Sequence, residues 1–369
     1  MKSAVKVLAV TLLLLSAVGL LVIRLAPQVL PGNSWDQLPA PPGEITAMVV
    51  APDTGTIYAA VRNSEDDATA LWVSASGREW TSAGVIPDCA EATGILLPPP
   101  DGGRQSILVT SFASHTVTGG IFLSTNGGAE WRDLCTGLPS SDIRVAWLHP
   151  GGTRLYVAMA RDGVAGSDDM GASWRLLNQG LTDLRVQTLC ISPDDADNLL
   201  AGTLKGLFRS TDGGDSWQPS SGGMSTVEPF VLLIIADPTM ENTFYALERT
   251  PGIRTHIYRS RDGGETWRLL GEELPAEFHP RSLLADPAHP GTIYMGTVYD
   301  GVYAGTGYGD SWRQWSTGIP LDQPIIIHSL ALRDGDAPTL LAATNRAGLL
   351  FSRRLPRGIA GILSHLLPR

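Results

Sequence analysis

Acidic side chains in a repeated setting are the first candidates for chemistry in this chain. The pattern Ser-x-Asp-x-Gly-x-Ser/Thr-Trp occurs at residues 124–131, 167–174, 210–217 and 260–267, with Asn126 and Glu130 as replacements in the first copy. A carboxylate beside a hydroxyl can act as a general acid or base. The same groups can instead accept hydrogen bonds from backbone N–H groups of a tight turn. Because the four copies are alike, we interpret the motif as a structural hairpin.

This structural role is assigned to three positions of each copy, the Ser, the Asp or Asn, and the Trp. Gly within the motif supplies positive φ, and Trp adds a large buried apolar area. The residues are Ser124, Asn126, Trp131, Ser167, Asp169, Trp174, Ser210, Asp212, Trp217, Ser260, Asp262 and Trp267.

The spacing of the motifs predicts an array of equivalent β units. Partial copies around Trp80 and Trp312 extend the series, so that successive motif tryptophans lie 43 to 51 residues apart. Each interval contains short β-branched or aromatic runs separated by Pro, Gly and Asp, and no helical period is evident between residues 45 and 355. Such an interval fits one blade of a β-propeller. We therefore predict an all-β propeller of four-stranded antiparallel blades.

The ends of the repeat region predict how the propeller closes. Residues 32–35 hold only the second half of the motif, whereas residues 348–352 hold a third strand and a first half with no tryptophan after them. We expect the N-terminal strand of Trp35 to pair with the strand of Phe351 and complete the last blade. This closure leaves no exposed sheet edge, and it gives seven blades within residues 32–355.

The motif resembles the Asp-box, or bacterial neuraminidase repeat, of WD40/YVTN/BNR-like propellers, and the resemblance covers nearly the whole repeat region. It implies that the boxes lie at the blade periphery, away from a ligand site. Sortilin shares these boxes but has ten blades and a cysteine-rich module, which this sequence lacks. The chain is more similar to the seven-bladed photosystem II assembly and stability factor. That similarity implies a membrane-associated, non-catalytic propeller with a cationic patch.

Ligands of propellers usually bind near the tips between second and third strands, which vary freely on a fixed frame. Five of the seven predicted tips carry Arg or Lys, although the chain has a net charge of −10. A ring of cations can hold a carboxylate, phosphate or sulfate, or an acidic peptide. Polar tips are also typical of any soluble protein. The candidate ligand-binding residues are Arg161, Lys205, Arg249, Arg254 and Arg346.

A glycoside hydrolase is the alternative from a different class. Sialidases, which share the box, use an arginine cluster, a Tyr–Glu pair and an Asp acid, but no Arg-Ile-Pro or Arg-Leu-Pro segment occurs near the first blade, where sialidases carry one. Xyloglucanase-type enzymes use two Asp residues, with carboxylates about 5–10 Å apart. Asp162 lies at one tip, and Tyr299 with Asp300 forms the one tyrosine–acid pair at another. We assign no catalytic residue and keep these three as the alternative.

The N-terminus carries a candidate membrane segment, residues 1–24. An uncharged apolar run covers residues 7–23, and seventeen helical residues span about 25 Å against a hydrocarbon core of about 30 Å. A signal peptide and an uncleaved anchor both fit, and the lack of a small-x-small cleavage site favours the anchor. Lys2 and Lys6 place the N-terminus inside. The short linker 25–31 then tethers the propeller on the extracytoplasmic side, periplasmic or at the cell surface; a cleaved signal would make the protein secreted.

The C-terminal tail, residues 356–369, differs in composition from the blades. Ile359, Ile362, Leu363, Leu366 and Leu367 recur at helical spacing beside arginines. A basic amphipathic helix on the membrane surface and a helix packed on the propeller itself both fit this pattern.

Cysteine and charge usage excludes several classes of function. Cys89, Cys135 and Cys190 match no metal spacing and no disulfide framework, although a bridge between Cys89 and Cys135 would join adjacent blades. Segment 194–198 is acidic enough for Ca²⁺, but it occupies a turn that other blades repeat without these acids, so we expect no metal and no cofactor. The net charge of −10 argues against nucleic acid as a partner.

The sequence predicts a non-catalytic binding or assembly scaffold for a protein or for an anionic glycan or peptide.

Overall fold

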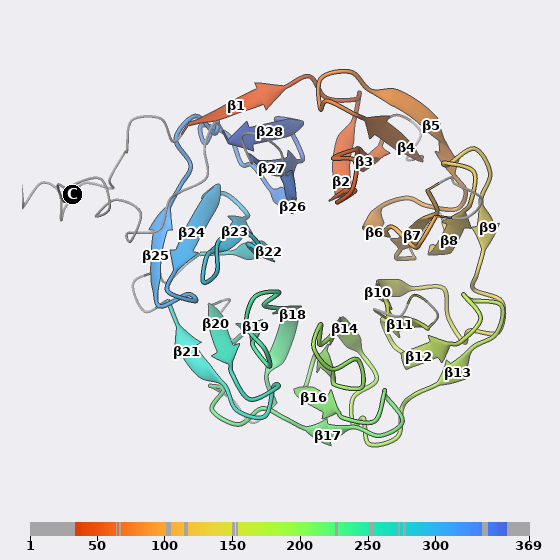
Figure 1. Cartoon of the computed structure of the whole chain (residues 1–369), viewed down its shortest axis with the longest axis vertical. Coiled ribbons are helices and arrows are strands. Elements are labelled where there is room, and N and C mark those ends of the chain that lie inside the picture. The colour runs from red at the N-terminus through yellow and green to blue at the C-terminus, as the bar shows by residue number, and fades with distance from the viewer. Residues whose placement is uncertain are drawn as a thin grey trace, which may run out of the picture.

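Seven antiparallel sheets surround a central axis in the computed structural model, as the sequence predicts (Figure 1). The structure describes residues 34–63, 65, 68–100, 105–113, 117–149, 152, 154–225, 228–250, 254–271, 274–275, 278–333 and 339–352. No helix occurs among these residues, so none that could cross a membrane is found in them. The expected membrane segment 1–24, the linker 25–31 and the tail 356–369 lie outside the described residues.

The first three blades each take four consecutive strands, from the innermost strand outward. Blade 1 contains β2 (Glu44–Val50), β3 (Ile57–Arg62), β4 (Thr69–Ser74) and β5 (Thr81–Ile86). Blade 2 contains β6 (Ala92–Leu96), β7 (Ile107–Ser111), β8 (Gly120–Ser124) and β9 (Arg132–Asp133). Blade 3 contains β10 (Ile143–Leu148), β11 (Leu155–Met159), β12 (Gly163–Ser167) and β13 (Arg175–Leu176).

The next three blades follow the same order. Blade 4 contains β14 (Val186–Ile191), β15 (Leu199–Thr203), β16 (Gly206–Ser210) and β17 (Gln218–Pro219). Blade 5 contains β18 (Phe230–Ala236), β19 (Phe244–Arg249), β20 (Thr255–Ser260) and β21 (Arg268–Leu270). Blade 6 contains β22 (Pro280–Ala285), β23 (Ile293–Thr297), β24 (Val302–Thr306) and β25 (Ser311–Gln314).

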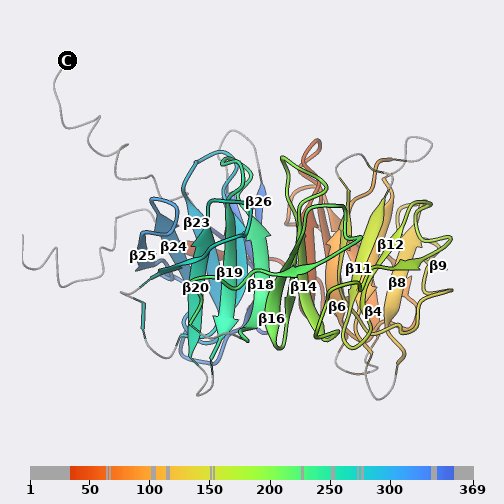
Figure 2. The ribbon, with the colours of Figure 1, turned by 90° about the horizontal axis from the view of Figure 1, so that it is seen from below.

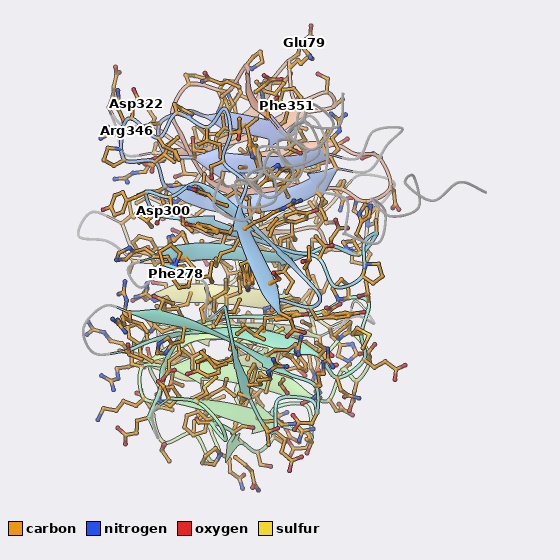
Figure 3. The ribbon with its side chains drawn as sticks, turned by 90° about the vertical axis from the view of Figure 1, so that its left-hand side faces the viewer. Glu79, Phe278, Asp300, Asp322, Arg346 and Phe351 are labelled. Atoms are coloured by element: carbon orange, nitrogen blue, oxygen red, sulfur yellow. The ribbon has the colours of Figure 1, made fainter. Side chains whose placement is uncertain are left out.

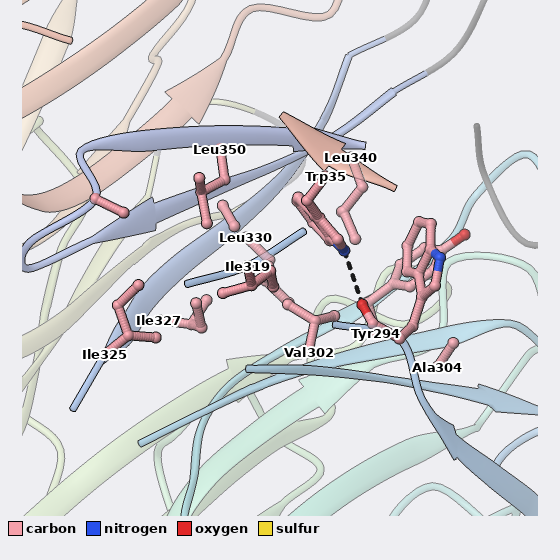
Figure 4. Close-up of a cluster of buried hydrophobic side chains, with 13 residues drawn as sticks. Trp35, Tyr294, Val302, Ala304, Ile319, Ile325, Ile327, Leu330, Leu340 and Leu350 are labelled. Atoms are coloured by element: carbon pink, nitrogen blue, oxygen red, sulfur yellow. Dashed lines mark hydrogen bonds between the residues drawn. The ribbon is translucent and has the colours of Figure 1, made fainter. Parts of the chain in front are cut away.

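Blade 7 joins the two ends of the repeat region and confirms the predicted closure. Its inner strands are β26 (Ile327–Arg333), β27 (Thr339–Thr344) and β28 (Leu349–Ser352), and its outer strand is β1 (Trp35–Leu38). β1 pairs with β28 in the register Trp35 to Ser352 and Asp36 to Phe351. Trp35 is only 2% exposed, and its indole N–H donates to the carbonyl of Trp315 at 2.7 Å in blade 6 (Figure 4). Burial of this ring therefore ties the closing strand to the neighbouring blade as well.

Each Asp-box forms the hairpin between a third and a fourth strand. In blade 4, Asp212 Oδ1 accepts hydrogen bonds from the backbone N–H of Ser216 at 2.9 Å and from the Ser210 hydroxyl at 2.7 Å. The Ser210 hydroxyl oxygen in turn accepts the backbone N–H of Gly214 at 2.8 Å. The same bonds recur in blades 2, 3 and 5. The box side chains thus satisfy the backbone donors of their own turn.

Apolar clusters between neighbouring blades form the core. Seven such clusters occur, one at each blade-to-blade seam. The motif tryptophans bridge these seams, because the indole N–H groups of Trp174, Trp217 and Trp267 donate to backbone carbonyls of the preceding blade at 2.7, 2.8 and 2.9 Å. Cys190 is fully buried in β14, and no disulfide links Cys89, Cys135 and Cys190.

The two ends of the propeller carry different connections. The Asp-box hairpins and the turns between first and second strands lie at one end, named the box end, which is at the top of Figure 2. The loops between second and third strands and the connections between blades lie at the opposite end, named the mouth. Arg346, Asp322 and Asp300 mark the mouth in Figure 3.

Candidate functional site

A β-bulge in every inner strand sends one side chain toward the axis near the mouth. The pairing of first and second strands skips one residue in all seven blades. A bulged residue leaves the regular alternation of a strand, so its side chain is re-aimed. The seven skipped residues all line one central cavity of about 710 Å³, and we name them the bulge ring: Thr46, Thr93, Arg144, Gln187, Leu232, Arg281 and His328.

The wall of this cavity has an excess of positive charge in an acidic chain. Arg144 and Arg281 come from the bulge ring, and Arg249 joins them from the end of β19. The one carboxylate that lines the cavity among the described residues, that of Glu91, lies 3.9 Å from the guanidinium of Arg62. Asp142 lies beside Arg144, whereas Arg249 and Arg281 form no ion pair within the described residues, so the wall keeps a net positive charge.

Arg144 is held in place but retains hydrogen-bonding capacity. Its guanidinium carbon lies 5.8 Å from the ring centre of Phe112, and Nη2 lies 3.9 Å from a carboxylate oxygen of Asp142. The Nε group is buried and has no hydrogen-bond partner. A buried donor without an acceptor is energetically unfavourable.

Arg281 and His328 are neighbours in the bulge ring with different charge behaviour. Arg281 is exposed and forms no ion pair within the described part of the chain. Burial lowers the pKa of His328, the nearby Arg281 lowers it further, and Glu44, whose Oε1 lies 2.9 Å from Nε2, only partly opposes this. His328 is therefore neutral at pH 7. The permanent charge of this pair resides on Arg281.

Tyr299 stands at the rim of the cavity in a constrained loop. Its ring is 54% exposed and lies edge-on to His279, with 6.1 Å between ring centres. Its φ of 87° is uncommon for an aromatic residue. The loop is fixed to both neighbouring connections, because Tyr299 N–H donates to Ile325 at 2.9 Å and Val298 N–H donates to His279 at 2.8 Å. The exposed ring is thus presented on a rigid support.

The structure separates the residues predicted from the sequence into two groups. Arg249 and Tyr299 line the cavity, and the others do not. Lys205 lies 3.8 Å from Glu228, and Arg346 donates to Gln323 at 3.3 Å. Arg254 borders a separate pocket of about 250 Å³ near the mouth. Arg161, Asp162 and Asp300 also lie on mouth loops outside the cavity wall.

The cavity does not bring the three alternative catalytic residues together in one site. Asp162 and Asp300 do not line it, and of that set only Tyr299 does. Burial raises the pKa of Asp300, which is a property of general acids. Among the described residues, no cluster of three or more His, Cys, Asp or Glu side chains is placed to hold a metal ion.

Sequence reasoning missed four basic side chains of the cavity. Arg144, Arg281 and His328 lie in bulges, and His279 lies in a connection between blades. Each bulge residue follows a buried residue at the start of the inner strand, such as Ile143 or Ile327. Alignment of the seven inner strands on that buried position would have brought the bulge ring into one column.

Fold and boxes together define a seven-bladed Asp-box β-propeller. The family model of the BNR/Asp-box repeat matches residues 258–269, the hairpin of blade 5. This match confirms the resemblance expected from the sequence. No curated protein matches the chain.

Solved structures with the same fold come from proteins of different kinds. YCF48 bound to D1 peptide is 16% identical with a TM-score of 0.61, and the match covers 89% of this chain and 99% of YCF48. An ancestral GH74 enzyme is 19% identical with a TM-score of 0.66, over 85% of this chain. The extracellular domain of a putative one-component system from B. thetaiotaomicron is 13% identical with a TM-score of 0.63, over 87% of this chain. The chain spans only 45% and 40% of the last two proteins.

Proposed function

We propose that the protein is a non-catalytic binding or assembly scaffold whose mouth binds a carboxylate-rich segment of a partner protein. The bulge ring delivers Arg144 and Arg281 to the cavity, and Arg249 adds a third guanidinium at its edge. Planar guanidinium groups match carboxylates in geometry and charge. An anionic glycan is the other ligand with this chemistry.

One observation carries the proposal: the cavity wall holds three arginines and, among the described residues, a single carboxylate, that of Glu91. The volume of about 710 Å³ suits several residues of an extended segment rather than a single ion. The complex of YCF48, which has the same fold, with a D1 peptide supports a peptide as the ligand class.

We propose that residues 1–24 anchor the protein in a membrane and that the propeller lies on the extracytoplasmic side. The apolar run 7–23 and the lysines before it support this placement. The extracellular domain of the putative one-component system, which has the same fold, supports it as well. An anchored chain stays in the membrane pellet after a high-salt wash, and release by salt alone would contradict the anchor.

Binding of a labelled Glu-rich peptide to the full chain in detergent micelles tests the function. We expect binding that weakens as salt rises, at least tenfold weaker binding for Arg281→Gln, and no binding of a matched Gln-rich peptide. Arg132→Gln is the control, since it removes an exposed arginine from the outer strand β9. Equal losses in both variants, or equal binding of both peptides, would refute a specific site at the mouth.

The raised pKa of Asp300 favours one second candidate, a glycoside hydrolase. In this alternative Asp300 is the general acid, and Asp162 is the second carboxylate. The same preparation is then incubated with chromogenic glycosides and with xyloglucan. Turnover that disappears in Asp300→Asn but not in Arg132→Gln would establish an enzyme and replace the scaffold proposal.

A further inference from the structure

A second hollow lies at the box end, and its chemistry differs from that of the mouth. It has a volume of about 360 Å³ and is lined almost entirely by apolar groups at the ends of the inner strands of blades 3 to 6. Trp147, Ile235 and Leu284 are only partly buried there, and Pro193 and Pro238 form its edge. We name this hollow the box-end groove. Apolar surface gathered in a concave site is typical of a docking position.

The chain itself leaves the described part of the propeller at this end. β28 is a third strand, so Ser352 lies at the box end, where the groove opens. Residues 353–369 follow it. The six residues 353–358 reach about 20 Å when extended. That length spans about two packed sheets, and blade 6, which is next to blade 7, contributes Leu284 to the groove.

The residues after this arm have a composition that suits the groove. Ile359, Ile362, Leu363, Leu366 and Leu367 fall on one side of a helix when placed at 100° per residue. A helix over 359–367 would be about 13 Å long. Alone in water, so short a helix is marginal and needs a partner for its apolar side.

Charge complementarity selects this segment over other occupants. The turns that carry the groove-lining Pro193 and Pro238 continue in sequence into the exposed acids Asp194, Asp195, Asp197 and Glu241, which we name the acidic edge. The arm before the apolar residues carries Arg353, Arg354 and Arg357. The basic arm is complementary in charge to the acidic edge. The apolar segment that follows it is complementary to the apolar groove.

We propose that the box-end groove binds residues 359–367 of the same chain as a short amphipathic helix. The arginines of the arm contact the acidic edge, and the apolar side chains cover Trp147, Ile235 and Leu284. This docking does not depend on the function proposed for the mouth, because the two sites lie at opposite ends of the propeller. It would fix the C-terminus to the box end and leave the mouth free.

Photo-crosslinking of the full chain in its membrane tests the proposal. A benzoylphenylalanine in place of Leu363 should form crosslinks within one chain to peptides that contain Trp147, Ile235 or Leu284, as identified by mass spectrometry. The matched control places the probe at Ser364, which lies on another side of the helix, and should give at most a tenth of that yield. Melting temperature checks that both labelled chains are folded.

A second variant tests the electrostatic part. Glu241→Lys reverses one charge of the edge without entering the core, and it should lower the yield from position 363 several-fold at low salt. An unchanged yield would overturn the contact between arm and edge. Adducts to lipid, to residues 1–33 or between two isotopically distinct copies, or equal yields from positions 363 and 364, would overturn docking of this segment in the groove.

Discussion

At the box end, four hairpins repeat the same hydrogen bonds, whereas at the mouth the seven bulge residues differ in size, polarity and charge. Both sets occupy equivalent positions in successive blades. The hydrogen bonds of an Asp-box lie within its own turn, so a substitution there destabilises the hairpin and, with it, the propeller. A bulge side chain leaves the ladder and points to the axis, so its identity can vary at little cost to the sheet.

A substitution in the closing strand β1 should cause the largest loss of stability. Trp35→Ala removes a ring that is 2% exposed and packs 5.2 Å from the ring of Trp315. We expect a loss of about 3–5 kcal/mol in unfolding free energy, measured by urea denaturation. Trp80→Ala, which removes a less buried indole in blade 1, should cost clearly less. Equal costs would mean that closure is no more critical than any other seam.

A substitution at the mouth should instead weaken ligand binding and leave the stability of the propeller unchanged. Arg144→Gln removes the charge and should weaken binding of a Glu-rich peptide about tenfold, or about 1.4 kcal/mol, while the melting temperature stays unchanged. Arg144→Lys retains the charge but lacks the Nε donor, so its affinity should fall between those of the other two proteins. A melting temperature that drops with the affinity would show that Arg144 serves the frame.

A single box should have a smaller effect on stability than the closing strand. Asp262 accepts the backbone N–H groups of Glu265 at 3.0 Å and Thr266 at 2.9 Å. Asp262→Ala should therefore cost about 1–3 kcal/mol without altering peptide affinity. Glu265→Ala in the same hairpin, which leaves both backbone donors satisfied, is the control. Lost binding at an unchanged melting temperature would contradict a structural role for the box.

The smallest expected effect is a difference in acid sensitivity between the parent protein and a variant of one Asp-box. Hydrogen bonds from Ser173, first from its hydroxyl and then from its backbone N–H, lower the pKa of Asp169 to about 2. A carboxyl with a depressed pKa in the folded state stabilises the fold above its ordinary pKa of about 4, and that stability is lost as the pH falls toward 2. In Asp169→Asn the loss of unfolding free energy between pH 4 and pH 2 should be smaller than in the parent. An identical slope would show that the box does not titrate in this range.

The frame could be predicted from the sequence because its determinants are local and repeated. The motif tryptophans fixed the length of a blade, and the half-motifs around Trp35 and Phe351 predicted the pairing of β1 with β28 that the structure confirms. Ser124, Asp169, Asp212 and Ser260 each accept a backbone N–H within their own hairpin turn.

The cavity could not be predicted in the same way. A β-bulge has no residue-type signature at positions such as Thr46, Leu232 or Arg281, since any side chain can occupy it. Tip residues were chosen from their place in the sequence, but whether a tip faces the axis depends on loop conformation. Arg249 and Tyr299 face the cavity, whereas Arg346 turns to Gln323.

The closure of blade 7 also has a consequence for synthesis. Gln37 on β1 donates a hydrogen bond to the carbonyl of Ala347, 310 residues later in the chain. At about 5–20 residues per second, the first strand leaves the ribosome roughly 15–60 s before its partner exists. During that interval six blades can form while the ring stays open. Premature chain termination near the last blade would therefore release an almost complete propeller with an unpaired first strand, a natural target for quality control by proteases.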